Sequence, residues 1–143
     1  IAMQCTNWRD AGQKIAFANG CFDLLHPGHI HLLREAAHNA DKLVVGLNGD
    51  TSVRRLKGAG RPTQSAELRS AVLAALPFVD AIAVFDEDTP FELIATLQPD
   101  IIVKGGDYNA DQVVGADIVA ARGGQVVIIS TLDGHATSKL ITA

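Results

Sequence analysis

The amino-acid sequence lacks the features that mark several classes of protein. None of its apolar runs approaches the roughly 18 residues that a membrane-spanning helix needs, and its first residues show no signal-peptide pattern. Only two cysteines occur, Cys5 and Cys21, and they form no C-x-x-C motif. Because isolated cysteines are typical of free thiols in a reducing compartment, we expect a cytoplasmic protein without a membrane partner.

Strong positive charge is absent as well, because the 143 residues carry a formal net charge of -4. This balance argues against a general nucleic-acid binder, so we expect no nucleic-acid partner. Basic residues gather in one short segment that contains Arg54, Arg55, Lys57 and Arg61. Such a run usually forms a solvated surface, and it becomes a candidate site only where a phosphate-binding element lies nearby.

Internal repeats, low-complexity tracts and flexible linkers are also missing, which predicts a single domain over residues 1–143. Short apolar runs alternate instead with helical patterns. The runs are typical of parallel strands buried on both faces and cover 14–19, 42–48, 80–85, 100–105 and 125–130. The helical patterns cover 29–39, 65–76, 90–98 and 111–121, the third opening with a predicted capping box of Thr89 and Glu92.

This alternation predicts an α/β fold with a doubly wound, Rossmann-like parallel sheet of five strands in the order 3-2-1-4-5. Ligands bind such sheets beyond the carboxyl ends of the strands. The loops after the first, fourth and fifth predicted strands are rich in Gly and polar residues; they read "GCFDLLHPGH", "KGGDY" and "TLDGHATS". We therefore expect the site at these loops.

The first loop contains two histidines, His26 and His29, separated by Pro27 and Gly28. A zinc site would need His31 as a third ligand, and no Cys or carboxylate has a matching short spacing. Burial in the core is a second interpretation. The histidines lie, however, where a loop becomes a helix, and helix N-termini expose N–H groups that attract anions. Imidazoles placed there can donate to phosphate oxygens, so the local pattern favours an anion site.

The segment "NGCFDLLHPGH" resembles the H-x-G-H signature of the cytidylyltransferase-like nucleotidyltransferases. The similarity continues through "LNGDTSVRRLKGAGRP", "FVDAIAVFDEDTP", "IIVKGGDY" and "DGHATSKLI", and it covers roughly residues 14–142. Within that superfamily the combination is similar to the adenylyltransferases of ADP-heptose synthesis, here as a stand-alone form. The resemblance implies direct in-line transfer of AMP from ATP to D-glycero-D-manno-heptose 1-phosphate, which releases pyrophosphate.

The resemblance also implies partners, and three rival functions stay open beside it. Mg²⁺ is expected with ATP as substrate, and a homodimer is expected because relatives commonly dimerise. One rival is a cytidylyltransferase that acts on glycerol 3-phosphate or another phosphoalcohol. A second is a non-catalytic nucleotide-binding module, and a third is a metal-binding protein.

The resemblance assigns roles to individual residues. The catalytic set is His26, His29 and Lys57. The nucleotide-binding set is Asn19, Gly20, Cys21, Phe22, Asp23, Gly28, Arg69, Lys104, Gly105, Gly106, Asp107, Gly134, Thr137 and Ser138. The sugar-phosphate set is Asp50, Arg54 and Arg61, and no residue is assigned to a metal.

Three of these positions carry open alternatives. Arg69 is equally well interpreted as a surface residue of a helix, and Asp50 as a cap of the turn that follows it. Ala136 stands where the family usually has Ser in its G-x-S-T-T segment, so one hydroxyl contact is missing there.

Overall fold

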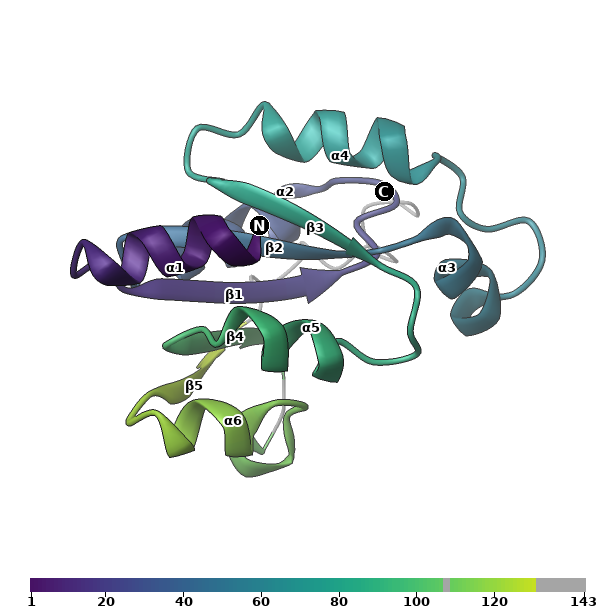
Figure 1. The fold of residues 1–143 in the computed structure, drawn as a ribbon. Helices are drawn as coiled ribbons and strands as arrows, with labels where there is room; N and C mark the ends of the chain where they lie inside the picture. Colours follow the sequence, from purple (N-terminus) through teal and green to yellow (C-terminus); the bar gives the residue numbers. More distant parts are fainter. Residues whose placement is uncertain (107–108, 131–143) are drawn as a thin grey trace.

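The structure is a computed structural model that describes residues 1–106 and 109–130. Its centre is a parallel sheet with the strand order β3-β2-β1-β4-β5, which confirms the predicted order. The strands are β1 (Ile15–Gly20), β2 (Lys42–Asn48), β3 (Ala81–Phe85), β4 (Ile101–Gly105) and β5 (Gln125–Ile129). In Figure 1 the arrowheads of β1 and β3 point toward the side of the molecule on which α3 lies, so this side holds the carboxyl ends of the strands.

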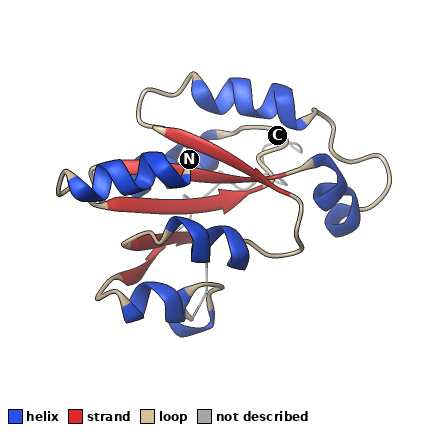
Figure 2. Cartoon of the chain, viewed as in Figure 1, coloured by secondary structure: helices blue, strands red, loops and turns tan. Residues whose placement is uncertain are grey.

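Helices cover both faces of the sheet, as Figure 2 shows. One face packs against α2 (Pro27–His38) and α4 (Ala66–Ala74), where Leu33 and Leu73 join a core that includes Ala18. The other face packs against α1 (Ala2–Asp10), α5 (Phe91–Leu97) and α6 (Ala116–Ala121), around a core that includes Phe17. Because successive side chains of a strand point to opposite faces, neighbouring residues of β1 belong to different cores.

Most predicted elements are present, with several corrected boundaries. The predicted helix 111–121 is wrong as one element, because it divides into the 3-10 helix η1 (Ala110–Gln112) and α6. Gly115 has a φ of 89° immediately before α6 and interrupts the helical path. The predicted capping box of the third helix is wrong as a box, since the N-cap of α5 is Pro90; the Thr89 hydroxyl still accepts a hydrogen bond from the backbone N–H of Phe91 at 3.4 Å.

Two helices have no counterpart among the predicted ones. The first is α1, whose one buried residue is Cys5, and its sequence has no apolar periodicity that would predict a helix. The second, α3 (Asp50–Lys57), is only eight residues long and buries Ser52 and Val53. None of the helices in the described part of the chain is both long and apolar enough to cross a membrane.

Candidate active site

The candidate site begins where β1 ends and the chain turns into α2. The N-cap of α2 is His26, whose backbone is extended, and Pro27 occupies the first turn, where a missing N–H costs nothing. The two histidines form a reciprocal capping box. The backbone N–H of Gly28 donates to Nδ1 of His26 at 3.1 Å, and the backbone N–H of His26 donates to Nδ1 of His29 at 3.3 Å.

This capping box determines how the imidazole rings present their protons. Each Nδ1 accepts a backbone hydrogen bond, so each neutral ring carries its proton on Nε2 and is a donor there. The two rings stack with centroids 3.8 Å apart. Burial, together with the nearby charges of His26 and Lys57, lowers the pKa of His29 to about 4. His29 is therefore a neutral donor at physiological pH.

The ring of Phe22 packs against the imidazole of His29. Its ring meets that of His29 edge-on, with centroids 5.2 Å apart. Phe22 is buried and has a φ of 47°, a left-handed conformation that turns the chain sharply after β1. A Cβ on Gly20 would lie 3.1 Å from this ring, so the close packing favours glycine at that position.

A cavity of about 300 Å³ opens beside His29, and we name it the histidine cavity. It brings together two segments that are far apart in the sequence. Its lining consists of Cys21, Phe22, Asp23, Leu24, His29, Lys57, Arg61 and Thr63. The expected basic segment thus reaches His29, with Lys57 as the last residue of α3 and Arg61 just beyond it.

Asp23 fastens this basic segment to the first loop. Its carboxylate accepts hydrogen bonds from Nε of Arg61 at 2.8 Å and from the backbone N–H groups of Thr63 and Gln64 at 2.7 and 2.9 Å. Burial raises the pKa of Asp23, but these hydrogen bonds outweigh burial, and the pKa lies below its ordinary value. The carboxylate is therefore ionised and orients Arg61 along the cavity.

Arg69 is among the most deeply buried side chains of the protein, with 1% of its surface exposed. The interpretation of Arg69 as a surface residue is therefore wrong. Its guanidinium donates to the carbonyl oxygens of Cys21 and Asn48 at 2.8 and 2.7 Å, and to that of Gln64 at 2.9 Å. It also pairs with the carboxylate of Asp50 at 2.7 Å. Arg69 thus ties two segments of the histidine cavity wall, those of Cys21 and of Thr63 and Gln64, to the end of β2.

Asp50 and Arg54 both belong to α3, but only the Asp50 side chain contacts the neighbouring segment. The Asp50 carboxylate accepts from the backbone N–H of Ala66 at 2.8 Å, so it satisfies the first turn of α4. Arg54 lies exposed on α3 and does not line the histidine cavity.

A second cavity of about 150 Å³, the Lys104 cavity, also lies at the carboxyl edge of the sheet. Its lining consists of Asn19, Pro90, Lys104, Gln112, Val113 and Val114. Lys104 precedes Gly105, the last residue of β4, and Gly106 follows with a φ of 105°. Burial lowers the pKa of Lys104. Four of the predicted residues, Asp107, Gly134, Thr137 and Ser138, lie outside the described residues, as does Ala136.

The sequence pattern missed several residues at the two cavities. Thr63 and Gln64 act through backbone N–H groups, which carry no side-chain signal. Pro90, the N-cap of α5, and Gln112, in η1, line the Lys104 cavity. Pro90 ends the quoted segment "FVDAIAVFDEDTP" and Gln112 follows "IIVKGGDY" by four residues, but no role was assigned to either. Within residues 1–106 and 109–130, no group of three or more His, Cys, Asp or Glu side chains is placed to hold a metal ion.

Comparison with known proteins connects this geometry to a family. A family model described as cytidylyltransferase-like matches residues 17–133. The bifunctional protein HldE of Nitrobacter winogradskyi is 54% identical over 136 residues, which are 95% of this chain and 28% of that protein. The HldE of Gluconobacter oxydans is 55% identical over 135 residues, again 28% of its length. The chain thus spans little more than a quarter of these curated relatives.

Solved structures show the same fold. The lipopolysaccharide core biosynthesis protein of Thermoplasma volcanium is 30% identical, with a TM-score of 0.68 and coverage of 85% of this chain and 98% of that one. A pantoate-beta-alanine ligase from Francisella tularensis has a TM-score of 0.63 at 15% identity, covering 99% of this chain and 71% of that one, a likeness of fold alone. The match to the family model over most of the chain, with the histidine pair at the N-terminus of α2, shows that this chain belongs to the cytidylyltransferase-like family.

Proposed function

We propose that this chain is a nucleotidyltransferase that transfers AMP from ATP to D-glycero-D-manno-heptose 1-phosphate, giving ADP-heptose and pyrophosphate. The observation that carries the proposal is the histidine cavity, in which a neutral imidazole donor and the cationic side chains of Lys57 and Arg61 face one space. Attack of one phosphate on another meets electrostatic repulsion, and such a set of positive charges and oriented donors lowers it.

In this proposal His26 and His29 donate from Nε2 to phosphate oxygens of the nucleotide. Because the capping box fixes both rings through Nδ1, the donors are oriented before the substrate binds, and little reorganisation is needed during the reaction. The positive end of the α2 dipole adds to the attraction. Lys57 neutralises charge that develops on the leaving pyrophosphate, and Arg61, in the same cavity, binds the sugar phosphate, as the resemblance implies.

The reaction needs no covalent intermediate with the protein. An oxygen of the sugar phosphate forms a bond to the α-phosphorus while the bond to the pyrophosphate oxygen breaks, and that oxygen keeps the electron pair. Cys21 lines the histidine cavity, but the attacking group is supplied by the substrate, so we assign the thiol no nucleophilic role. The buried Asp23 and Arg69 keep the walls of the cavity in place.

The choice of nucleotide and sugar rests on the sequence resemblance and on the relatives. The name of the Thermoplasma volcanium protein, a lipopolysaccharide core biosynthesis protein, agrees with a heptose that enters a surface glycan. We further propose that Mg²⁺ arrives with ATP as part of the substrate, since Mg²⁺ is commonly bound through substrate phosphates. A cytoplasmic homodimer completes the proposal; the exposed Leu68 and Val72 of α4 and Val84 of β3 offer an apolar surface for it.

The test is pyrophosphate release with Mg²⁺, both anomers of heptose 1-phosphate, and ATP or CTP supplied separately. Release with ATP and one anomer is the expected result. Release with CTP and glycerol 3-phosphate would support the rival transferase, and ATP binding without release would support the non-catalytic module.

The double change His26→Ala and His29→Ala should lower turnover by at least about 10²-fold, the usual loss when one or more transition-state donors are removed. A matched control is His38→Ala, because His38 lies exposed in the last turn of the same helix. Unchanged turnover in the double variant would refute the assigned role of the histidine pair.

A further inference from the structure

Lys57 reaches the histidine cavity from the last position of α3, so its position depends on how that helix is held in place. The two residues that α3 buries, Ser52 and Val53, lie near its beginning. Val53 contributes apolar packing, and Ser52 is the polar member of the pair. The attachment of α3 at its beginning therefore determines where its end lies.

Ser52 connects the start of α3 to the end of β2. No part of Ser52 is exposed, and only 5% of Asn48, the last residue of β2, is exposed. Nδ2 of Asn48 donates to the hydroxyl oxygen of Ser52 at 3.0 Å. The Ser52 hydroxyl donates in turn to the carbonyl oxygen of Glu87 at 3.4 Å, in the segment between β3 and α5. One hydroxyl group thus joins α3 to two separate segments.

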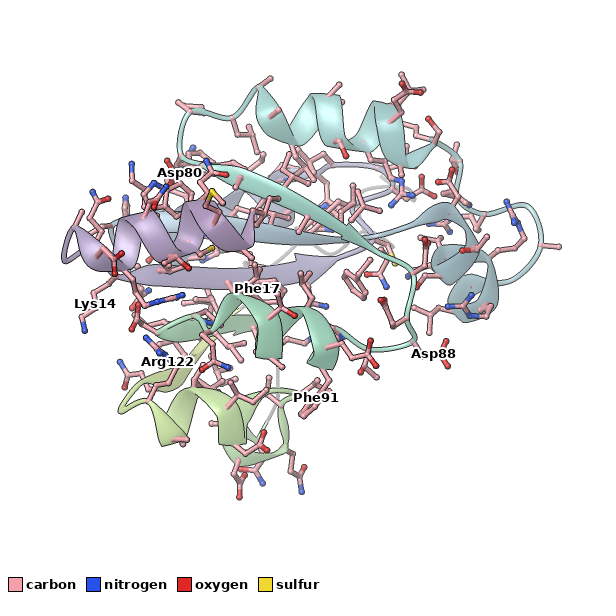
Figure 3. The ribbon with its side chains drawn as sticks, viewed as in Figure 1. Lys14, Phe17, Asp80, Asp88, Phe91 and Arg122 are labelled. Atoms are coloured by element: carbon pink, nitrogen blue, oxygen red, sulfur yellow. The ribbon has the colours of Figure 1, made fainter. Side chains whose placement is uncertain are left out.

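The other side-chain contacts between α3 and the segment after β3 lie at the surface. The Thr51 hydroxyl donates to the Asp86 carboxylate at 3.1 Å, and this hydrogen bond is exposed. Nε of Arg55 donates to the Asp88 carboxylate at 3.0 Å, also in an exposed position. Figure 3 shows Asp88 in the segment that runs from β3 to α5, beside α3. Because water competes for exposed polar groups, such contacts contribute little, and the hydroxyl of Ser52 is the contact best protected on this side of the helix.

The distance from Ser52 to Lys57 makes this contact important for the site. A helix rises by about 1.5 Å per residue, so the two residues lie about 7.5 Å apart along the axis of α3. A tilt of about 10° at Ser52 would therefore move the end of the helix by about 1.3 Å. A misplacement of about 1 Å in a reacting site can cost about 10²-fold in rate. Because Ser52 is fully buried, it acts on the reaction only through the residues that it holds.

We propose that Ser52 is a positioning residue, whose buried hydroxyl holds the first turn of α3 against Asn48 and Glu87 and thereby places Lys57 in the histidine cavity. This inference rests on the proposed function, in which Lys57 neutralises charge on the leaving pyrophosphate. It adds to the site a residue that touches no substrate and to which the sequence resemblance assigned no role.

The test is a double-mutant cycle with Lys57. Ser52→Ala should lower kcat for pyrophosphate release about tenfold to a hundredfold while KM for ATP stays within about twofold, because Lys57 acts on charge that develops in the transition state. Lys57→Met should lower kcat at least as much. In the double variant the loss of Ser52 should cost less than about twofold beyond Lys57→Met, because the group that it positions is already absent. An unchanged kcat in Ser52→Ala, or losses that multiply fully in the double variant, would overturn the positioning role.

Two controls separate positioning from a general loss of stability. Thr51→Ala removes the neighbouring hydroxyl of the same helix, whose hydrogen bond is exposed, and kcat should stay within about twofold. Val119→Ala creates a cavity in the core beneath α6 and should lower the urea midpoint without lowering kcat. Ser52→Thr keeps the hydroxyl and should recover part of the kcat lost in Ser52→Ala. A loss of kcat in Val119→Ala as large as that in Ser52→Ala would overturn the inference, because the loss would then follow stability alone.

An NMR titration of the His29 ring tests the inference without any turnover. If the wild-type chain releases no pyrophosphate with any substrate pair, the proposed function fails, and this titration still decides the role of Ser52. Burial and the charge of His26 would continue to lower the pKa of His29, but a displaced Lys57 would lower it less. The pKa should therefore rise in Ser52→Ala, by less than in Lys57→Met, and should not change in Thr51→Ala. The same pKa in Ser52→Ala as in the wild type would overturn the inference.

Discussion

Replacing Arg69 by Met should destabilise the protein strongly, because the guanidinium is buried and fully engaged. The change leaves the carbonyl oxygens of Cys21, Asn48 and Gln64 without their donor and the Asp50 carboxylate without its partner. An unsatisfied buried polar group costs about 1–3 kcal/mol, and removing one partner of a buried ion pair costs about 3–5 kcal/mol. Since water can reach part of the Asp50 carboxylate, which is 40% exposed, we expect a loss of about 3–5 kcal/mol.

Urea denaturation followed by circular dichroism measures this loss. With an m value of about 2 kcal/mol/M, the midpoint should fall by about 2 M. Arg54→Met is the matched control, because Arg54 is exposed on the neighbouring helix α3, and its midpoint should stay within about 0.3 M of the wild type. Arg69→Lys can satisfy only some of the acceptors and should fall between the two.

A loss below about 1 kcal/mol in Arg69→Met would refute this reasoning. It would mean that the three carbonyl groups find other donors once the guanidinium is gone. The stability measurement also bears on function, because the carbonyls of Cys21 and Gln64 belong to segments that border the histidine cavity. A folded Arg69→Met variant should therefore show a lower kcat/KM at temperatures well below its unfolding transition.

Three further predictions concern pH, loop anchoring and packing. The pKa of His29 is about 4 in the folded chain and 6.5 in the unfolded one, so as the pH falls the unfolded chain binds a proton before the folded chain does. The free energy of unfolding should therefore fall by at most about 3 kcal/mol between pH 6.5 and pH 4. The urea midpoint should fall less over this range in His29→Asn than in the wild type, and an equal fall in both would contradict the assignment. Asp23→Asn should loosen the loop that carries Arg61 and lower kcat/KM about tenfold or more, measured by pyrophosphate release; full activity would argue against an anchoring role. Gly46→Ala should lower the free energy of unfolding by about 1–3 kcal/mol, because the new Cβ would lie 2.6 Å from the Phe17 ring; an unchanged urea midpoint would show that the ring moves away freely.

Much of the fold could be predicted because its information is local. A strand buried on both faces needs an apolar run bounded by turn residues, and all five runs match strands to within one residue at either end, with 42–48 matching β2 at both ends. Helices with a clear apolar stripe were predicted at nearly their observed positions. The helices that were missed, α1 and α3, read AMQCTNWRD and DTSVRRLK; polar residues predominate in both, so their sequences carry no such stripe.

The sequence by itself determined that the chain alternates strands and helices, that a helix begins at the H-x-G-H segment, and that the candidate site is to be sought at the carboxyl edge of the sheet. Only the tertiary structure decided which distant groups meet there. Asp23 and Arg61 are 38 residues apart and Arg69 and Cys21 are 48 residues apart, and no periodic pattern relates them. Their contacts depend on the paths of the loops between β1, α3 and α4. In the same way, side-chain alternation in β4 places Lys104 on the side of Ile102, the face of the sheet opposite α2, the helix that carries His29. The faces become distinct only once the strands have paired and the helices have packed on them.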